Sequence, residues 1–279
     1  MFTNPIPFKE AIAALDQRVL LPTTGNSAQL AALPAALRDE AMFSSKVSDA
    51  RILQAAKDRI AAIVQPEGRA PGQSMNTATA REQIRDLLKS LGYAPEQGKE
   101  GSIEDLTSRS RLDLIIDTNV AMARGRGQWT ATQDADVLDE WPCQELYRAE
   151  DREHERNWAQ RWRAAGGKLY GVSSEPDFNF RRAIARKNDP IWYRISRFGK
   201  PWPPFDFNSG MDVEDVDREE AIALGVISER ESVDPKHAPA LNLSAPLAHL
   251  ADFLVHEVTQ ALGSRSSIKD GLLSFIGAS

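Results

Sequence analysis

A stretch of twenty residues, 191–210, constrains the fold more than any other part of the chain. It holds six aromatic residues and three prolines. The prolines lack a backbone N–H and have a fixed φ angle, so we expect this stretch to run extended rather than as a helix or central strand. All six tryptophans lie between Trp129 and Trp202. The stretch is therefore predicted to complete a hydrophobic core and to bury Trp192 and Trp202; a binding role for an exposed face is the alternative.

The overall composition excludes several classes of protein. A chain of 279 residues, 42% hydrophobic and 27% charged, is typical of a globular protein with one large or two modest domains. Its net charge of -6 argues against binding nucleic acid over most of the surface. The single cysteine, Cys143, excludes an internal disulfide and suits a reducing compartment. Neither a transmembrane segment nor a signal peptide is expected, since no apolar run is long enough for either.

The N-terminal third reads as four amphipathic helices joined by polar loops. Apolar residues recur at spacings of three and four in each of them. The predicted helices are residues 8–20, residues 28–41 with Ser27 as cap, a third that Ser48 caps and that ends before Gln65, and a fourth that Thr77 opens and Gly92 closes. Helices of this length are marginal alone, so they must pack on one another or on a partner.

The longest predicted helix spans residues 108–129. Asn119 lies on its apolar face and needs a hydrogen-bonding partner there. Gly125 and Gly127 are unfavourable in a helix by about 1 kcal/mol each relative to alanine. They are expected to mark either the end of this helix or the close approach of another backbone segment.

Short strands and helices are predicted for the rest of the middle of the chain. We expect strands at residues 144–150, 168–172 and 211–216, and a helix over residues 151–163 that buries Trp158 and Trp162 as a pair. Asp217 and Glu220 have the spacing of a capping box, which predicts a short helix that Gly225 closes. The fold class is thus predicted to be α+β, with an extended proline- and aromatic-rich loop in the central part.

The C-terminal region reads as a linker, residues 229–245, followed by an amphipathic helix with Ser244 as its cap. Four apolar residues form one stripe on this helix: Leu247, Leu250, Leu254 and Val258. Because the linker is long, we interpret the stripe as a docking surface for another subunit. Deleting residues 240–279 should then leave a folded chain; burial in the chain's own core is the alternative.

A search for catalytic or metal-binding patterns finds little. Asp151, His154 and Glu155 lie close together in the sequence, but no further ligand has a recognisable spacing. No nucleophile motif or phosphate-binding loop is present, and Cys143 beside Trp141 and Pro142 reads as a packed side chain. We therefore predict no catalytic residues, no metal and no cofactor.

One patch combines charge with aromatic rings. Between residues 181 and 200 there are seven basic residues and one acid, with Trp192 and Tyr193 interleaved. The basic residues are Arg181, Arg182, Arg186, Lys187, Arg194, Arg197 and Lys200. Such a mixture is typical of sites that follow a nucleic-acid backbone. The alternative is that the patch pairs with the acidic block 212–220, which holds six acids and one arginine.

The order of several motifs resembles the phage Mu protein F-like minor head proteins, also called the phage head-morphogenesis family. The helix Arg111–Trp129 resembles that family's "Arg…Thr-Asn…Ala…Gly-Arg/Gln-Trp" helix. Four further segments follow in the family's order: Glu150–His154, Gly167-Lys168, Asp189-Pro-Ile-Trp192 and Trp202-Pro-Pro204. The resemblance covers residues 108–227. The family's closing cysteine element is absent, because Phe207–Met211 stands in its place, so no role of those cysteines carries over.

The resemblance implies a structural protein of the phage head, present in few copies at the portal vertex, without catalysis. It suggests three regions: a helical region 1–107, a head-morphogenesis-like module 108–228, and a linker with a docking helix, 229–279. The expected partners are the portal and major capsid proteins, with phage DNA as a further partner, and the expected locations are the virion and the cytoplasm of the bacterial host. Two rivals stay open: a DNA-contacting protein that aids genome packaging or ejection through residues 181–200, and an enzyme that uses Asp151 and His154.

Overall fold

The chain folds into two compact units. The second is one continuous segment, and the first is formed by the segments before and after it. A computed structural model describes residues 9–34, 37–38, 41–65, 75–153, 156–174, 176–236, 243–247 and 249–275. The first unit comprises residues 1–124 together with 239–279, and the second comprises residues 125–238. The fold is α+β, as predicted. The division differs from the expected three regions, because the C-terminal segment belongs to the same unit as the N-terminal helices.

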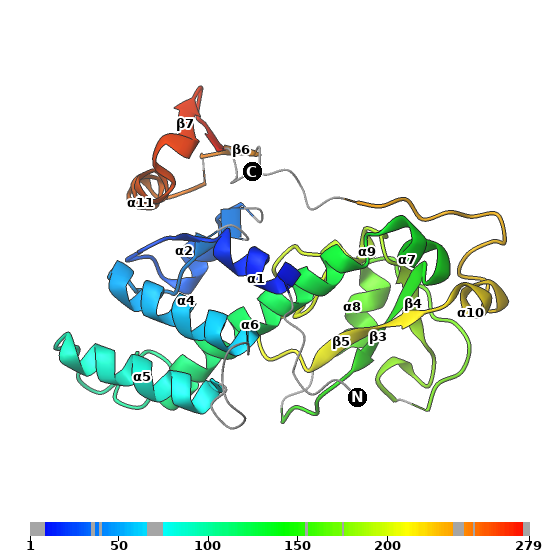
Figure 1. The fold of residues 1–279 in the computed structure, drawn as a ribbon, viewed down its shortest axis with the longest axis horizontal. Coiled ribbons are helices and arrows are strands. Elements are labelled where there is room, and N and C mark those ends of the chain that lie inside the picture. The colour runs from blue at the N-terminus through cyan, green and yellow to red at the C-terminus, as the bar shows by residue number, and fades with distance from the viewer. Residues whose placement is uncertain are drawn as a thin grey trace. The chain divides into compact units, whose positions relative to one another are not determined.

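The first unit is mainly helical (Figure 1). Its helices are α1 (Lys9–Asp16), α2 (Ser27–Ala31), α4 (Ala50–Val64), α5 (Thr77–Ser90), α11 (Asp252–Leu262) and the start of α6 (Arg109–Ala131), with the short 3-10 turn η2 (Gly263–Arg265) after α11. Two small sheets complete it: β1 (Val19–Leu20) pairs in parallel with β2 (Ala41–Met42), and β6 (Leu243–Pro246), β8 (Leu272–Phe275) and β7 (Ser266–Lys269) pair antiparallel in that order.

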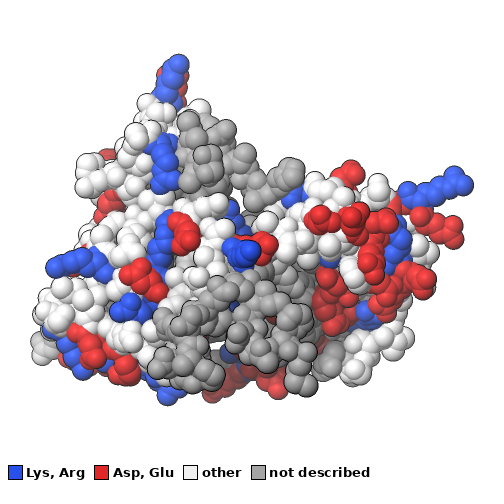
Figure 2. All heavy atoms as spheres, in the orientation of Figure 1, with Lys and Arg blue, Asp and Glu red and all other residues white. Residues whose placement is uncertain are grey.

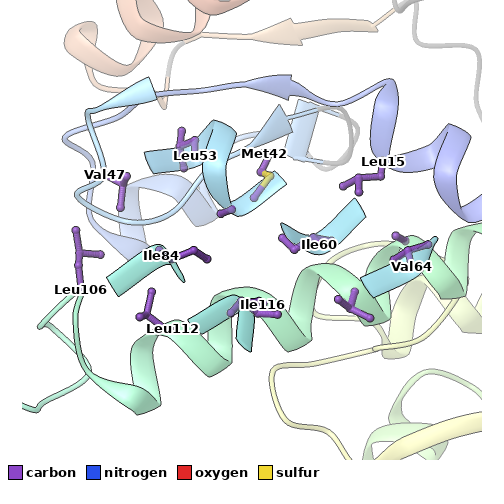
Figure 3. Close-up of a cluster of buried hydrophobic side chains, with 14 of the residues drawn as sticks. Leu15, Met42, Val47, Leu53, Ile60, Val64, Ile84, Leu106, Leu112 and Ile116 are labelled. Atoms are coloured by element: carbon purple, nitrogen blue, oxygen red, sulfur yellow. The ribbon is translucent and has the colours of Figure 1, made fainter. Parts of the chain in front are cut away.

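Aliphatic side chains fill the main core of the first unit. Figure 3 shows residues of α1, α4, α5 and α6 pointing toward one another, among them Leu15, Ile60, Ile84 and Ile116. The helix α4 presents Leu53, Ala56, Ile60 and Val64 to this core, which is the spacing of three to four predicted from the sequence. Asp49 caps α4 rather than Ser48, since its carboxylate accepts from the Arg51 N–H at 2.8 Å.

Two N-terminal helices are shorter than predicted, for local reasons. Pro34 disfavours a helical conformation at the residue before it, and α2 accordingly ends at Ala31 instead of continuing to residue 41. Its cap is Asn26, not Ser27, in a capping box with Gln29. The helix predicted over residues 8–20 gives way after Asp16 to β1, whose pairing with β2 satisfies its backbone.

The helix α6 begins in the first unit and ends in the second. Asn119 on its apolar face has the expected partners: its side-chain oxygen accepts from Arg18 Nη1 at 2.8 Å, and its nitrogen donates to the Ile115 carbonyl at 2.8 Å. The helix does not end at Gly125. A β-carbon at Gly125 would overlap the carbonyl oxygen of Pro203, so this glycine permits a close backbone approach, the second of the two predicted reasons.

The second unit has a three-stranded antiparallel sheet, β4 (Ala183–Arg186), β3 (Cys143–Arg148) and β5 (Met211–Val216), in that order. Short helical segments accompany it: α7 (Ala135–Glu140), α8 (Trp158–Ala164), the 3-10 turn η1 (Pro176–Phe178), α9 (Ile191–Ile195) and α10 (Arg218–Ala223). The strand predicted at residues 168–172 is a single bridge between Tyr170 and Arg182.

Aromatic rings fill the core of the second unit. Trp162 lies 5.4 Å from Trp192, and Trp192 lies 5.9 Å from Phe205, measured between ring centroids. Trp202 packs 5.2 Å from Trp129. The predicted burial of four tryptophans is confirmed: Trp158, Trp162, Trp192 and Trp202. The first five residues of the stretch 191–210 form α9, however, because Asp189 accepts from the Ile191 N–H and starts a helical turn ahead of the prolines.

Candidate functional site

The basic patch of residues 181–200 separates into members with different surroundings. Arg182 donates to Glu145 at 2.6 Å and also to Glu220. Arg186 pairs with Glu231 at 2.5 Å, and the buried Lys187 amine lies 2.9 Å from Asp215. The alternative of pairing with the acidic block 212–220 is thus confirmed for Arg182 and Lys187. Neighbouring carboxylates thus balance the charges of Arg182, Arg186 and Lys187.

The pKa values of the Arg182 cluster reflect this pairing. The Glu220 carboxylate, followed by that of Glu145, raises the pKa of Arg182 above its ordinary value. Burial raises the pKa of Glu145, although the bond from Arg182 works in the opposite direction. Glu220 does not complete the predicted capping box with Asp217, because its carboxylate accepts from Arg182 instead. Asp217 itself caps α10 as predicted, accepting from the Glu220 N–H at 2.8 Å.

The other patch residues differ in exposure. Arg181 and Arg194 are exposed and donate to backbone carbonyls, Arg181 to those of Leu169 and Tyr170 and Arg194 to that of Ala165. Lys200 is buried. The prediction that its side chain belongs to a binding surface is therefore wrong. Its burial follows from the tight turn after α9, where the Lys200 N–H donates to the Ser196 hydroxyl.

Arg197 belongs to a cluster that the sequence did not predict. Together with Arg156 and Arg161 it surrounds the carboxylate of Asp206. The three arginines lie 9, 45 and 50 residues from Asp206 in the sequence, beyond the reach of any helix or strand periodicity. The only local signal is Arg161, which lies three residues after Trp158 on α8 and stacks over its ring.

The residues weighed as metal ligands or nucleophiles form no such site in the described part of the chain. Asp151 is exposed, whereas His154 and Glu155 lie outside the described residues. Among the described residues, no group of three or more histidine, cysteine, aspartate or glutamate side chains is close enough to hold a metal ion. Cys143 is fully buried, and burial raises its pKa to about 12, so its thiol stays protonated and unreactive. The prediction of a packed cysteine is confirmed.

A small recess in the first unit has an apolar lining. Val47, Leu53, Leu88 and Leu106 contribute to it, and its one polar side chain, Ser44, accepts from Arg111 at 2.7 Å. Ligand sites combine an apolar wall with several converging polar groups. This recess is part of the hydrophobic core.

The C-terminal stripe is not a free docking surface, and the predicted interpretation is wrong for its central residues. Leu254 and Val258 are buried against Leu21, Leu30 and other residues of the first unit, and Leu247 and Leu250 pack at the edge of the same cluster. The helix α11 also begins later than predicted, at Asp252, because residues 243–246 pair with β8 as strand β6. The carboxylate of Glu257 on α11 accepts from the Thr23 and Thr24 hydroxyls, which fixes the helix to the loop after β1.

No family model, curated protein or solved structure matches this chain. The resemblance to the phage head-morphogenesis family therefore depends on the motif residues themselves. Within the described residues, no helix combines the length and apolar character that crossing a membrane requires.

Proposed function

We propose that this chain is a structural minor head protein of a tailed bacteriophage or prophage, which acts at the portal vertex during head assembly. One observation carries the proposal. Four of the five segments that resemble the phage head-morphogenesis family, although spread over 94 residues, pack against one another in two pairs. Contacts between segments that lie far apart in the sequence are what a family module requires, and a set of chance matches has no reason to meet.

The first and last of these segments meet at Gly125. The backbone of Pro203 approaches this glycine so closely that a side chain there would overlap it, and Trp129 packs on Trp202. The helix motif ending in Gly-Gln-Trp129 and the segment Trp202-Pro-Pro204 thus form one packed unit. The residue types in both segments follow from this packing, since a glycine gives the backbone room and the tryptophans fill the space beside it.

Two further segments, Gly167-Lys168 and Asp189–Trp192, meet at Trp162. A β-carbon at Gly167 would overlap the Trp162 ring and Ile191, and the Trp162 indole N–H donates to the Lys168 carbonyl at 2.8 Å. The Trp192 ring meets that of Trp162 edge-on, and its indole N–H donates to the Arg186 carbonyl at 2.8 Å. Gly167-Lys168 and Asp189–Trp192 therefore have structural roles that support a module used for assembly.

The proposal is tested by assembling heads with and without this chain. The chain would be produced together with the portal and major capsid proteins of the phage or prophage that encodes it, and the particles examined by mass spectrometry and electron microscopy. We expect a few copies per particle, located at the portal vertex, and defective heads when the chain is omitted. A Gly125→Leu variant, which displaces Pro203, should fail to enter particles, whereas Thr130→Ala, at an exposed position of α6 outside the motif, should enter normally. Normal heads that never contain the chain would overturn the proposal.

A further inference from the structure

Three arginine side chains converge on one carboxylate in the second unit. Arg161 Nη1 lies 2.9 Å from Asp206 Oδ2, Arg156 Nε lies 3.4 Å from the same oxygen, and Arg197 Nη1 lies 3.5 Å from Oδ1. Three positive groups around one negative group leave an excess of two positive charges. A guanidinium does not deprotonate at physiological pH, so the excess persists and an incoming anion would relieve it.

The arginines of this cluster are held in position before any ligand arrives. The Asp206 side chain is buried and accepts from the Phe207 N–H at 2.8 Å. Arg156 donates to the Phe207 carbonyl at 2.7 Å and to that of Asn208, whereas Arg161 stacks over Trp158 and Arg197 over Phe207. Such contacts reduce the side-chain entropy that binding would otherwise cost.

The cluster also reaches solvent. The side chains of Arg197, Arg156 and Arg161 are 60%, 37% and 28% exposed, respectively. A guanidinium has five N–H donors. Among the described residues, Asp206 is the acceptor that the guanidiniums of Arg161 and Arg197 contact, so several donors of these two side chains face solvent or a ligand.

Three other described basic side chains of the second unit lie beside carboxylates that offset their charge. Arg182 is balanced by two carboxylates, and Arg186 and Lys187 by one each. Acidic side chains gather over the part of the unit that carries α7, β5 and α10, as the red atoms in Figure 2 show. Anions are therefore repelled from that face and attracted to the Asp206 cluster.

We propose that Arg156, Arg161 and Arg197 bind the phosphate groups of a nucleic-acid backbone. Guanidinium forks match phosphate oxygens in geometry as well as charge. All three donors are long side chains on an open surface, which a phosphate on an extended strand can reach, and Phe207 beside Arg197 is 38% exposed and offers a ring to a base. The inference concerns a binding activity of the purified chain and does not depend on the proposed role in heads.

The proposal is tested by fluorescence anisotropy of the full chain with a labelled single strand and a labelled duplex of about 20 nucleotides. An excess of two charges predicts that log affinity falls with log salt at a slope of about -1.4 for the single strand and about -1.8 for the duplex. Affinity should thus fall roughly tenfold between 50 and 200 mM salt. Arg197→Gln should weaken binding at least about threefold and reduce the slope by about one.

The matched control is Arg230→Gln, which removes the same charge from an exposed residue outside the cluster. This variant should leave both affinity and slope unchanged, and both variants should unfold at the wild-type temperature. Equal weakening by the two substitutions, or no binding to either nucleic acid at 50 mM salt, would overturn the proposal. Calorimetric titration with inorganic phosphate separates the two sources of phosphate: binding of free phosphate without binding of either strand would also overturn it.

Discussion

Aliphatic side chains from long helices fill the main core of the first unit, whereas aromatic side chains from short segments fill that of the second. The first core draws on α4, α5 and α6, each of which repeats its apolar residues every three or four positions. The second draws on Trp158, Trp162, Trp192 and Phe205, and half-buried ion pairs such as Arg148–Asp177 lie around it. In a periodic helix the core residues can be identified from the sequence of that helix alone. Short segments form a core only through contacts with residues that are distant in the sequence. We therefore expect the stability of the second unit to fall more when a single core side chain is removed.

The largest effect is expected from removing the C-terminal part of the first unit. Deleting residues 239–279 takes away Leu254, Val258 and Leu262, which are buried against the N-terminal segments. At about 1.5–3 kcal/mol for each buried side chain, the first unit should lose about 5–9 kcal/mol of stability. Hydrogen exchange measured by mass spectrometry should show faster exchange in α2 and in the paired strands β1 and β2, which hold Leu30 and Ala41 of the same cluster.

A matched pair of point variants checks this deletion. Leu254→Ala should cost about 2–5 kcal/mol, and Phe253→Ala, at a partly exposed position on the same helix, clearly less. If the shortened chain keeps full protection in α2, β1 and β2, the helix α11 is a detachable element after all, and the first unit ends with α6.

A single ring should account for much of the stability of the second unit. Trp192 is fully buried between Trp162 and Phe205, so Trp192→Ala leaves a cavity and should cost about 3–5 kcal/mol in denaturant unfolding. Phe180→Ala removes an exposed ring and should change stability by no more than about 0.5 kcal/mol. Similar losses for both would mean that the aromatic core is loosely packed.

The buried thiol predicts how stability depends on alkaline pH. In the unfolded chain Cys143 ionises near pH 8.5, whereas in the folded chain its pKa is about 12. The stability that this thiol contributes is present below pH 8.5 and is lost as the pH rises toward 12, because the unfolded state alone releases the proton. Between pH 8 and pH 10 the wild type should lose about 2 kcal/mol more than Cys143→Ala. Parallel losses, or rapid labelling of the native thiol at pH 8, would contradict full burial.

The smallest effect concerns the cap of α10. Asp217→Ala removes the acceptor of the Glu220 N–H and should cost about 1 kcal/mol, measured by thermal unfolding. Asp217→Ser keeps an acceptor at this position and should cost clearly less. Equal losses of stability in the two variants would mean that Asp217 stabilises α10 through its charge rather than through the capping hydrogen bond.

Local patterns in the sequence determined several elements correctly. The spacing of apolar residues predicted α4 and α5, and the alternation of residues 211–216 predicted β5. Asp217 predicted the start of α10. Gly125 in the helix predicts the close approach of another backbone segment, which is that of Pro203. In each case the information lies within a few residues, because helix and strand periodicities and caps are properties of sequence neighbours.

The tertiary structure alone decided where charges are neutralised and which apolar stripe is covered. The seven basic residues of the stretch 181–200 look equivalent in the sequence. In the structure, Arg182 and Lys187 pair with carboxylates on β3 and β5, whereas Arg197 lies with arginines about forty residues earlier around Asp206. Leu254 and Val258 likewise look free until Leu21 and Leu30, more than two hundred residues away, cover them. The physical reason is common to both: Coulomb attraction and apolar burial depend on distance in space, which the fold sets and sequence spacing does not.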